Sequence, residues 1–162
     1  MAVVYLGLGS NIDPEENLRL GLRELGHRYG KLIISDIYQN AAVGFDGDDF
    51  LNLVVGFETD DDPATIHDHI EQIHKMAGRQ RNEEGFSART LDIDLLLYGD
   101  LVISAPPLRL PRPDVLKYSF VLRPLAEIAS DFVHPVTGRK LIDHWQECDA
   151  GGHPLTRVDV TL

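Results

Sequence analysis

The stretch FSARTLDIDLLLYGD, residues 86–100, contains a strand-like apolar run that is interrupted by two aspartates. Asp is uncommon in strands, and a buried carboxylate without a partner is costly. Because side chains alternate between the two faces of a strand, Asp92 and Asp94 share one face, and every second residue from Ile93 to Leu97 shares the other. The two aspartate Cα atoms are then about 6.6 Å apart. A positively charged group on the aspartate face must offset the repulsion between the two carboxylates.

The segments around this strand predict a β-α-β-β-α-β order followed by further helices. Runs rich in Val, Ile and Leu predict strands, and an Asp-Pro pair before an apolar stripe of helical period predicts a helix start. This order is typical of an α+β, ferredoxin-like sandwich, in which two helices cover one face of an antiparallel sheet, here with additional C-terminal helices. One domain over residues 1–162 is expected. The predicted strands are 2–10, 31–43, 50–59 and 91–99; the predicted helices run from Asp13-Pro14 to Gly30, from Asp62-Pro63 to about Gly78, and over 119–129 and 140–148.

The charge of the chain excludes some partners and points to a local anion site. A net charge of −11 argues against binding to nucleic acids or to anionic membranes, because both require a basic surface. The segment 79–123 nevertheless holds 7 Lys and Arg against 6 Asp and Glu, whereas the remainder holds 8 against 20. This asymmetry favours an anion-binding region, although chance and solvated faces would also explain it.

Cysteine content and the N-terminal residues indicate the cellular compartment. The single cysteine, Cys148, allows no internal disulfide and suits a reducing cytoplasm. The opening MAVVYLGLGSN has no basic residue before its apolar run and is too short to span a bilayer. We therefore expect a cytoplasmic protein with no targeting or membrane segment.

The residues around the two aspartates suggest that the repulsion is offset by a metal ion. Mg²⁺ prefers oxygen ligands and is typically held by one or two carboxylates together with substrate phosphates. Guanidinium groups bind phosphate oxygens in bidentate fashion, and five arginines flank the strand. Two solvated acids on an exposed face are the alternative. Paired acids among arginines favour a nucleoside-triphosphate transfer site, without a Walker-A or kinase glycine motif. The arginines are Arg79, Arg81, Arg89, Arg109 and Arg112.

Several motifs together resemble one enzyme family. YLGLGSNI, FLNLVV, GRQR, RTLDIDLLLYG and FVLRPLAEIA occur in the same order as in the 6-hydroxymethyl-7,8-dihydropterin pyrophosphokinases of folate biosynthesis and cover nearly the whole chain. RTLDIDLLLYG is highly specific, whereas Gly-Ser-Asn alone would be weak. The resemblance implies transfer of pyrophosphate from ATP to the pterin hydroxymethyl group, giving the pterin diphosphate and AMP.

The resemblance also implies a set of site residues. Two Mg²⁺ ions would be held by Asp92 and Asp94, small-molecule substrates would be the only partners, and the chain would be a monomer. The residues expected to act in catalysis are Arg79, Arg81, Arg89, Asp92 and Asp94. Those expected to bind ATP are Glu71, His74, Arg79, Arg89, Arg109 and Arg112. Those expected to bind the pterin are Asn40, Val43, Phe45, Asn52, Phe86 and Phe120.

Four positions depart from the family pattern. His74 stands where an acid is common, Phe86 replaces a tryptophan, Arg112 replaces a histidine, and Tyr118 replaces an arginine. The alternative function is therefore a divergent, weakly active or non-catalytic paralogue that binds pterin or nucleotide as a sensor.

A zinc site is a further alternative. His67, Glu71 and His74 are spaced i, i+4 and i+7 on one helix face, but two helical turns is a long reach for three ligands of one ion. A solvated helix face explains the same pattern.

Overall fold

The computed structural model describes residues 1–44, 46–78, 91–148 and 154–162. Its central sheet has the strand order β5-β1-β4-β3-β8, and β2 also pairs with β4. All of these pairs are antiparallel. The sheet strands are β1 (Ala2–Ser10), β2 (Ile33–Ile34), β3 (Ile37–Asn40), β4 (Phe50–Thr59), β5 (Asp92–Tyr98) and β8 (Leu155–Val158).

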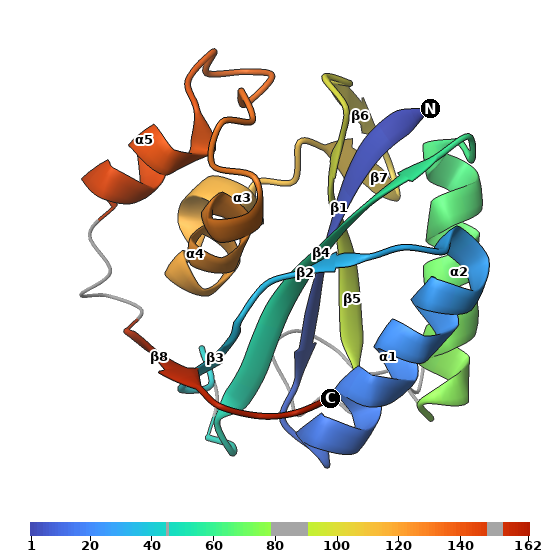
Figure 1. Ribbon diagram of the computed structural model, residues 1–162, viewed down its shortest axis with the longest axis vertical. Helices are drawn as coiled ribbons and strands as arrows, with labels where there is room; N and C mark the ends of the chain where they lie inside the picture. Colours follow the sequence, from blue (N-terminus) through green and yellow to red (C-terminus); the bar gives the residue numbers. More distant parts are fainter. Residues whose placement is uncertain (45, 79–90, 149–153) are drawn as a thin grey trace.

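Helices cover both faces of the sheet (Figure 1). One face lies against α1 (Pro14–Tyr29) and α2 (Pro63–Met76), and α3 (Asp114–Lys117), α4 (Ser119–Ile128) and α5 (Leu141–Glu147) lie on the other. Two apolar clusters fill these layers. The α1/α2 layer includes Leu6, Leu25 and Ile66, and the α3–α5 layer includes Leu96 and Leu125. The predicted α+β, ferredoxin-like arrangement with additional C-terminal helices is confirmed.

A bulge in β5 changes which face its later residues occupy. The pairing with β1 shifts between Tyr5, opposite Leu97, and Leu6, opposite Leu95, so Leu96 is the extra residue. Leu97 therefore packs beside Leu96 in the α3–α5 cluster, while Ile93 and Leu95 belong to the other. The expectation that Leu97 shares a face with Ile93 was wrong, because strict alternation fails across a bulge.

The strand predicted over 31–43 is interrupted by Ser35. Its backbone N–H donates to Val54 O, while its Oγ accepts from Val54 N, both at 2.9 Å. A side chain thus takes the place of a backbone acceptor, and the segment divides into β2 and β3. The hairpin of β6 (Ile103–Ala105) and β7 (Leu108–Leu110), helix α3 and strand β8 were not predicted.

The two predicted helix caps differ in outcome. Asp62 has extended backbone and accepts a hydrogen bond from Thr65 N at 2.8 Å, as expected. Asp13 has φ 43° and ψ 53° and makes no capping bond with its side chain. Capping needs an extended backbone, so the left-handed conformation of Asp13 explains why that prediction was wrong.

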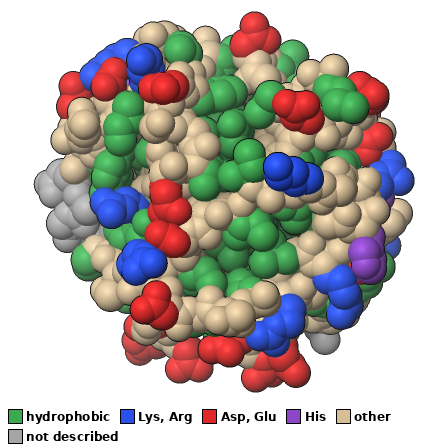
Figure 2. Space-filling view, viewed as in Figure 1, with side chains coloured by type: hydrophobic (Ala, Val, Ile, Leu, Met, Phe, Trp, Pro, Cys, Tyr) green, Lys and Arg blue, Asp and Glu red, His purple; other side chains and the backbone are tan. Residues whose placement is uncertain are grey.

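The surface is apolar at its centre and acidic at one end. In Figure 2, hydrophobic side chains fill a hollow between the two helical layers, and Asp and Glu gather at the end of the molecule near the start of α1. Ile33 and Ile34 of β2 are 54% and 48% exposed. Among the described residues, no helix is long and apolar enough to cross a membrane.

Candidate active site

A row of paired residues crosses the sheet on the α3–α5 face. Asp92 of β5 lies opposite Gly9 of β1, Gly9 opposite Asn52 of β4, and Asn52 opposite Tyr38 of β3. Directly opposed residues of antiparallel strands point to the same face. Strands are about 4.8 Å apart, so Asp92 and Asn52 stand about 9.6 Å apart across a glycine that has no side chain. The row forms an open floor with a carboxylate at one side and an amide at the other.

Arg112 lies against the second aspartate of β5. Its Nη2 is 3.5 Å from Asp94 Oδ1, and its Nε is 3.4 Å from Asp114 Oδ2. Burial acts to lower the pKa of Arg112, but Asp94, Asp114 and then Asp92 raise it, and the net result is a pKa above its ordinary value. All three ion-pair side chains are only partly buried. A guanidinium therefore offsets part of the carboxylate repulsion at this site.

His74 of α2 closes the edge of the sheet beside the aspartates. Strand β5 ends the sheet, and its Ile93 N–H donates to His74 Nε2 at 2.9 Å. His74 is 4% exposed, and its Nδ1 lies 3.3 Å from Glu71 Oε1. Because Nε2 accepts a hydrogen bond, Nδ1 carries the proton in the neutral ring. Both ring nitrogens are thus engaged, which argues against the zinc site considered with His67.

The amide of Asn52 has a fixed orientation. Its Nδ2 donates to Asn40 Oδ1, and Asn40 in turn donates to Ala41 O at 3.0 Å. Asn52 Oδ1 lies over Gly9, where an added Cβ would be only 2.6 Å from it. The sequence reasoning did not single out Gly9, although a glycine inside a strand often marks close approach of another group.

Ser10, the last residue of β1, and Asn11 order the turn that follows the strand, and Asn11 also holds the loop that precedes β4. Asn11 is 4% exposed and its Nδ2 donates to Asp48 O at 3.1 Å, while Ser10 Oγ donates to Ile12 O at 3.0 Å. Val43, which is half-buried, lies in the same loop. The motif therefore positions the loop side of the site.

Two aromatic residues in the described ranges, Phe120 and Phe50, are candidates for stacking on a ligand at this floor. Phe120, at the start of α4, stacks on Tyr118 with ring centroids 4.9 Å apart, and Lys117 Nζ lies 5.1 Å from the Tyr118 ring centroid. Phe50 is two residues before Asn52 in β4, so both share a face, and Phe50 is half-buried. The sequence reasoning missed Phe50, whose spacing to Asn52 was the available signal.

Other predicted site residues divide into two groups. Arg109 of β7 is exposed and lines a cavity together with Arg112. The remaining predicted site residues lie outside the described ranges: Arg79, Arg81, Arg89, Phe45 and Phe86.

The aspartate pair suits Mg²⁺ better than it suits a metal ion that is coordinated by protein side chains alone. Asp92 and Asp94 are both half-buried, and no group of three or more His, Cys, Asp or Glu side chains able to hold a metal occurs in the described ranges. Mg²⁺ uses few carboxylates and completes its shell with water and phosphate. The donor set therefore fits magnesium together with a phosphate substrate.

Comparisons with known proteins identify a family and several relatives. The family model for 7,8-dihydro-6-hydroxymethylpterin-pyrophosphokinase (HPPK) matches residues 5–130. The chain is 35% identical over 139 residues to 2-amino-4-hydroxy-6-hydroxymethyldihydropteridine pyrophosphokinase of Haemophilus influenzae, covering 83% of this chain and 86% of that protein. The protein of the same name from Aquifex aeolicus is 35% identical over 143 residues, covering 87% and 89%.

A solved structure supports the fold. The crystal structure of wild-type Plasmodium falciparum HPPK-DHPS superposes with a TM-score of 0.72 at 13% identity. It covers 90% of this chain, whereas this chain spans 44% of that one. At this identity the likeness concerns the fold alone.

Proposed function

The chain belongs to the 7,8-dihydro-6-hydroxymethylpterin-pyrophosphokinase family, whose members are pyrophosphokinases of folate biosynthesis, and we propose the roles of its residues in that reaction. The hydroxymethyl oxygen of 6-hydroxymethyl-7,8-dihydropterin attacks the β-phosphorus of ATP. The bond between the α- and β-phosphates breaks, AMP leaves, and the hydroxyl proton is released. The pterin keeps the pyrophosphoryl group.

The observation that carries this proposal is the polar floor on one face of the sheet. Asp92 and Asp94 stand at one side of Gly9, and Asn52 stands at the other. Asp92 and Asp94 would hold two Mg²⁺ ions, which neutralise phosphate charge and act as Lewis acids when bound. The floor thus offers a phosphate side and a pterin side within one small space.

Arg112 changes partner during substrate binding in this proposal. In the structure its guanidinium neutralises Asp94. When Mg·ATP occupies the site, Arg112 leaves Asp94 and binds a phosphate oxygen, for which a planar guanidinium is well suited. Lys117, whose ammonium lies over the Tyr118 ring, supplies positive charge where the family has an arginine. Arg79, Arg81 and Arg89 would add guanidinium groups for the phosphates, and Glu71 would complete the proposed ATP set. His74 instead supports strand β5, because both of its ring nitrogens are engaged.

The pterin lies between aromatic rings and is oriented by Asn52. Phe120 and Phe50 would supply two of these rings, and Phe45 or Phe86 would complete the enclosure. Asn52 reads the polar edge of the pterin because Asn40 fixes its amide. Asn40 and the backbone at Val43 would add hydrogen bonds. The enzyme would act as a cytoplasmic monomer, consistent with the free thiol of Cys148.

The test is release of AMP from ATP in the presence of Mg²⁺, measured with and without the pterin. Pterin-dependent AMP supports the proposal, and ADP would instead indicate simple kinase chemistry. The departures at Arg112 and Tyr118 favour the second candidate, a paralogue that binds pterin without turnover. Pterin binding with no nucleotide product would establish that second candidate and overturn the first.

A further inference from the structure

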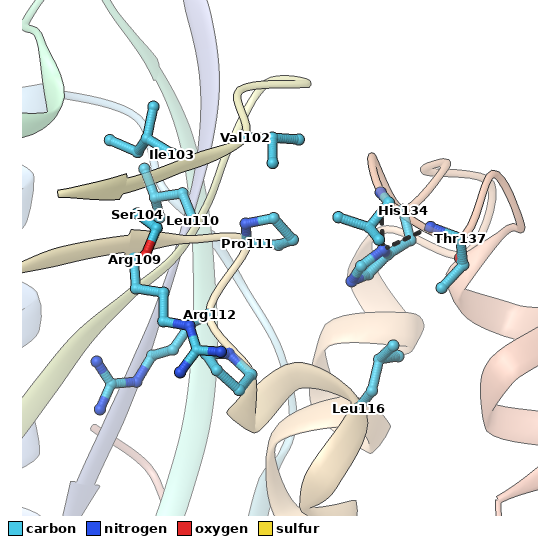
Figure 3. A pocket seen from close by; sticks show the side chains of 12 residues that line it. Val102, Ile103, Ser104, Arg109, Leu110, Pro111, Arg112, Leu116, His134 and Thr137 are labelled. Carbon is cyan, nitrogen blue, oxygen red and sulfur yellow. Dashed lines mark hydrogen bonds between the residues drawn. The ribbon is translucent and has the colours of Figure 1, made fainter.

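A cavity of about 400 Å³ lies outside the polar floor, between the β6–β7 hairpin, α3 and the loop at 134–137 (Figure 3). Its volume is in the lower part of the range for small-molecule sites. Arg109 and Pro111 line one side, His134 and Thr137 lie opposite them, and Leu116 lies on α3. None of the roles proposed for the pyrophosphoryl transfer uses the His134 side of this cavity.

His134 provides an N–H donor at the wall of the cavity. It is only 4% exposed. Its Nδ1 accepts from Val136 N at 3.2 Å and from Thr137 N at 3.3 Å, so the proton of the neutral ring is on Nε2. The ring lines the cavity, and its Nε2–H has no hydrogen-bond partner among the residues that the structure describes. This N–H is therefore available to an acceptor that a ligand in the cavity brings.

The loop that carries His134 is itself well ordered by hydrogen bonds. His134 N donates to Arg139 O and Gly138 N donates to His134 O, both at 2.9 Å. Burial, followed by the neighbouring His144, lowers the pKa of His134 below its ordinary value. The ring therefore stays neutral near pH 7 and presents a fixed donor to the cavity.

The rest of the lining includes two cations, Arg109 and Arg112, and several aliphatic side chains. Arg109 is exposed and forms no ion pair with the acidic residues in the described part of the chain. Val102, Leu116 and Val136 are 55%, 42% and 64% exposed at the cavity. We propose that this cavity binds a small organic acid, whose carboxylate accepts hydrogen bonds from Arg109 and His134 Nε2–H and whose apolar body packs against Val102, Leu116 and Val136.

Benzoate is the probe for this site, with benzyl alcohol as its uncharged counterpart and inorganic phosphate as an anion that lacks an apolar body. Binding is measured by calorimetry and by the ¹⁵N resonances of labelled histidine, with and without a saturating non-hydrolysable ATP analogue. We expect benzoate to bind with a dissociation constant on the order of 1 mM or less, and to shift the His134 Nε2 resonance. Benzyl alcohol and phosphate should bind at least about tenfold more weakly.

Two variants in one loop distinguish binding in the cavity from non-specific binding at the protein surface. Val136→Asp places a negative charge at the cavity and should weaken benzoate binding about tenfold or more. Val133→Asp adds the same charge at a position that is 50% exposed and outside the cavity lining, and should change binding less than about twofold. Both positions are exposed, so both variants should fold.

Each other outcome overturns the proposal. Equal loss in the two variants, or binding that leaves His134 unshifted, would mean non-specific attraction of anions. Equal binding of benzyl alcohol would mean that the carboxylate is not recognised, and no binding at all would remove the site. Displacement of benzoate by the ATP analogue would assign the cavity to the nucleotide site. None of these readouts depends on pyrophosphokinase activity, so the two proposals fail separately.

Discussion

The two faces of the sheet are both apolar in their interior, but only one also carries a polar row. Under α1 and α2, residues such as Leu6, Leu25 and Ile66 are fully buried. Under α3–α5, Leu96 and Leu125 are equally buried, yet the same face ends in the row that contains Asp92 and Asn52. Stability and chemistry should therefore respond to different substitutions.

The largest expected effect is on turnover, from Asp94→Asn. The variant keeps the shape of the side chain but loses a proposed metal carboxylate, so turnover should fall about 10³-fold or more. The free energy of unfolding should change by less than about 1 kcal/mol, since the ion pair with Arg112 is partly exposed. Rate measurements test the loss of turnover, and thermal melts test the change in stability. Asp131→Asn is the control, because the side chain of Asp131 is 84% exposed. Retained turnover would remove Asp94 from the reaction.

Ile66→Ala should have the largest effect on stability. Ile66 is fully buried under α2, and removing its side chain leaves a cavity that costs about 2–5 kcal/mol. Turnover per folded molecule should stay near the wild-type value. Met76→Ala, in the same helix but 57% exposed, should cost less than about 0.5 kcal/mol. Urea titrations measure the difference, and a loss of turnover in folded Ile66→Ala would break the separation of the two faces.

Gly9→Ala should weaken pterin recognition selectively. The added Cβ would lie 2.6 Å from Asn52 Oδ1 and force that amide to move, so the KM for the pterin should rise about tenfold. The KM for ATP should change little. Gly7→Ala is the matched control in the same strand, because its Cβ would meet only the flexible Leu96 side chain at 3.4 Å. Equal changes in the two variants would contradict a specific role for Gly9.

The smallest expected effect is the pH dependence that His134 contributes. Its pKa is lowered in the folded protein, so the unfolded chain binds the proton more tightly. The stability contribution is therefore present above the unfolded pKa of about 6.5 and is lost as the pH falls toward the folded value. When the pH is lowered from about 8 to about 5, a range that spans that pKa, the melting temperature should fall less steeply for His134→Gln than for the wild type. An identical slope would assign the dependence to other groups, such as His69, whose pKa is also lowered.

Local patterns in the sequence predicted much of the fold. Strands β1 and β4 have continuous runs of strand formers and were placed at 2–10 and 50–59, as observed. The bulge at Leu96, the interruption at Ser35 and the strand pairing of β8 depend on contacts with distant residues. Local propensity carries no information on such contacts.

For the site, alternation placed Asp92 and Asp94 on one face, but the partner of Asp94 could not be derived. Arg112 reaches Asp94 only because the hairpin of β6 and β7 returns the chain to β5, where Arg112 N donates to Leu96 O at 2.9 Å. Gly9 and Phe50 were recognisable from their strand positions. Their roles required the register between β1 and β4, which a single sequence does not supply.

In the proposed site Asp92 and Asp94 bind the metal ion, and Arg112 forms an ion pair with Asp94 when no metal ion is bound. The most direct measurement is Mn²⁺ binding, followed by electron paramagnetic resonance without nucleotide, in the wild type, Arg112→Gln and the control Arg139→Gln. Arg139 pairs with Glu147 instead. The account predicts about three- to tenfold tighter Mn²⁺ binding in Arg112→Gln, because a competing cation is removed, and no change in the control. Unchanged or weaker binding in Arg112→Gln would contradict it.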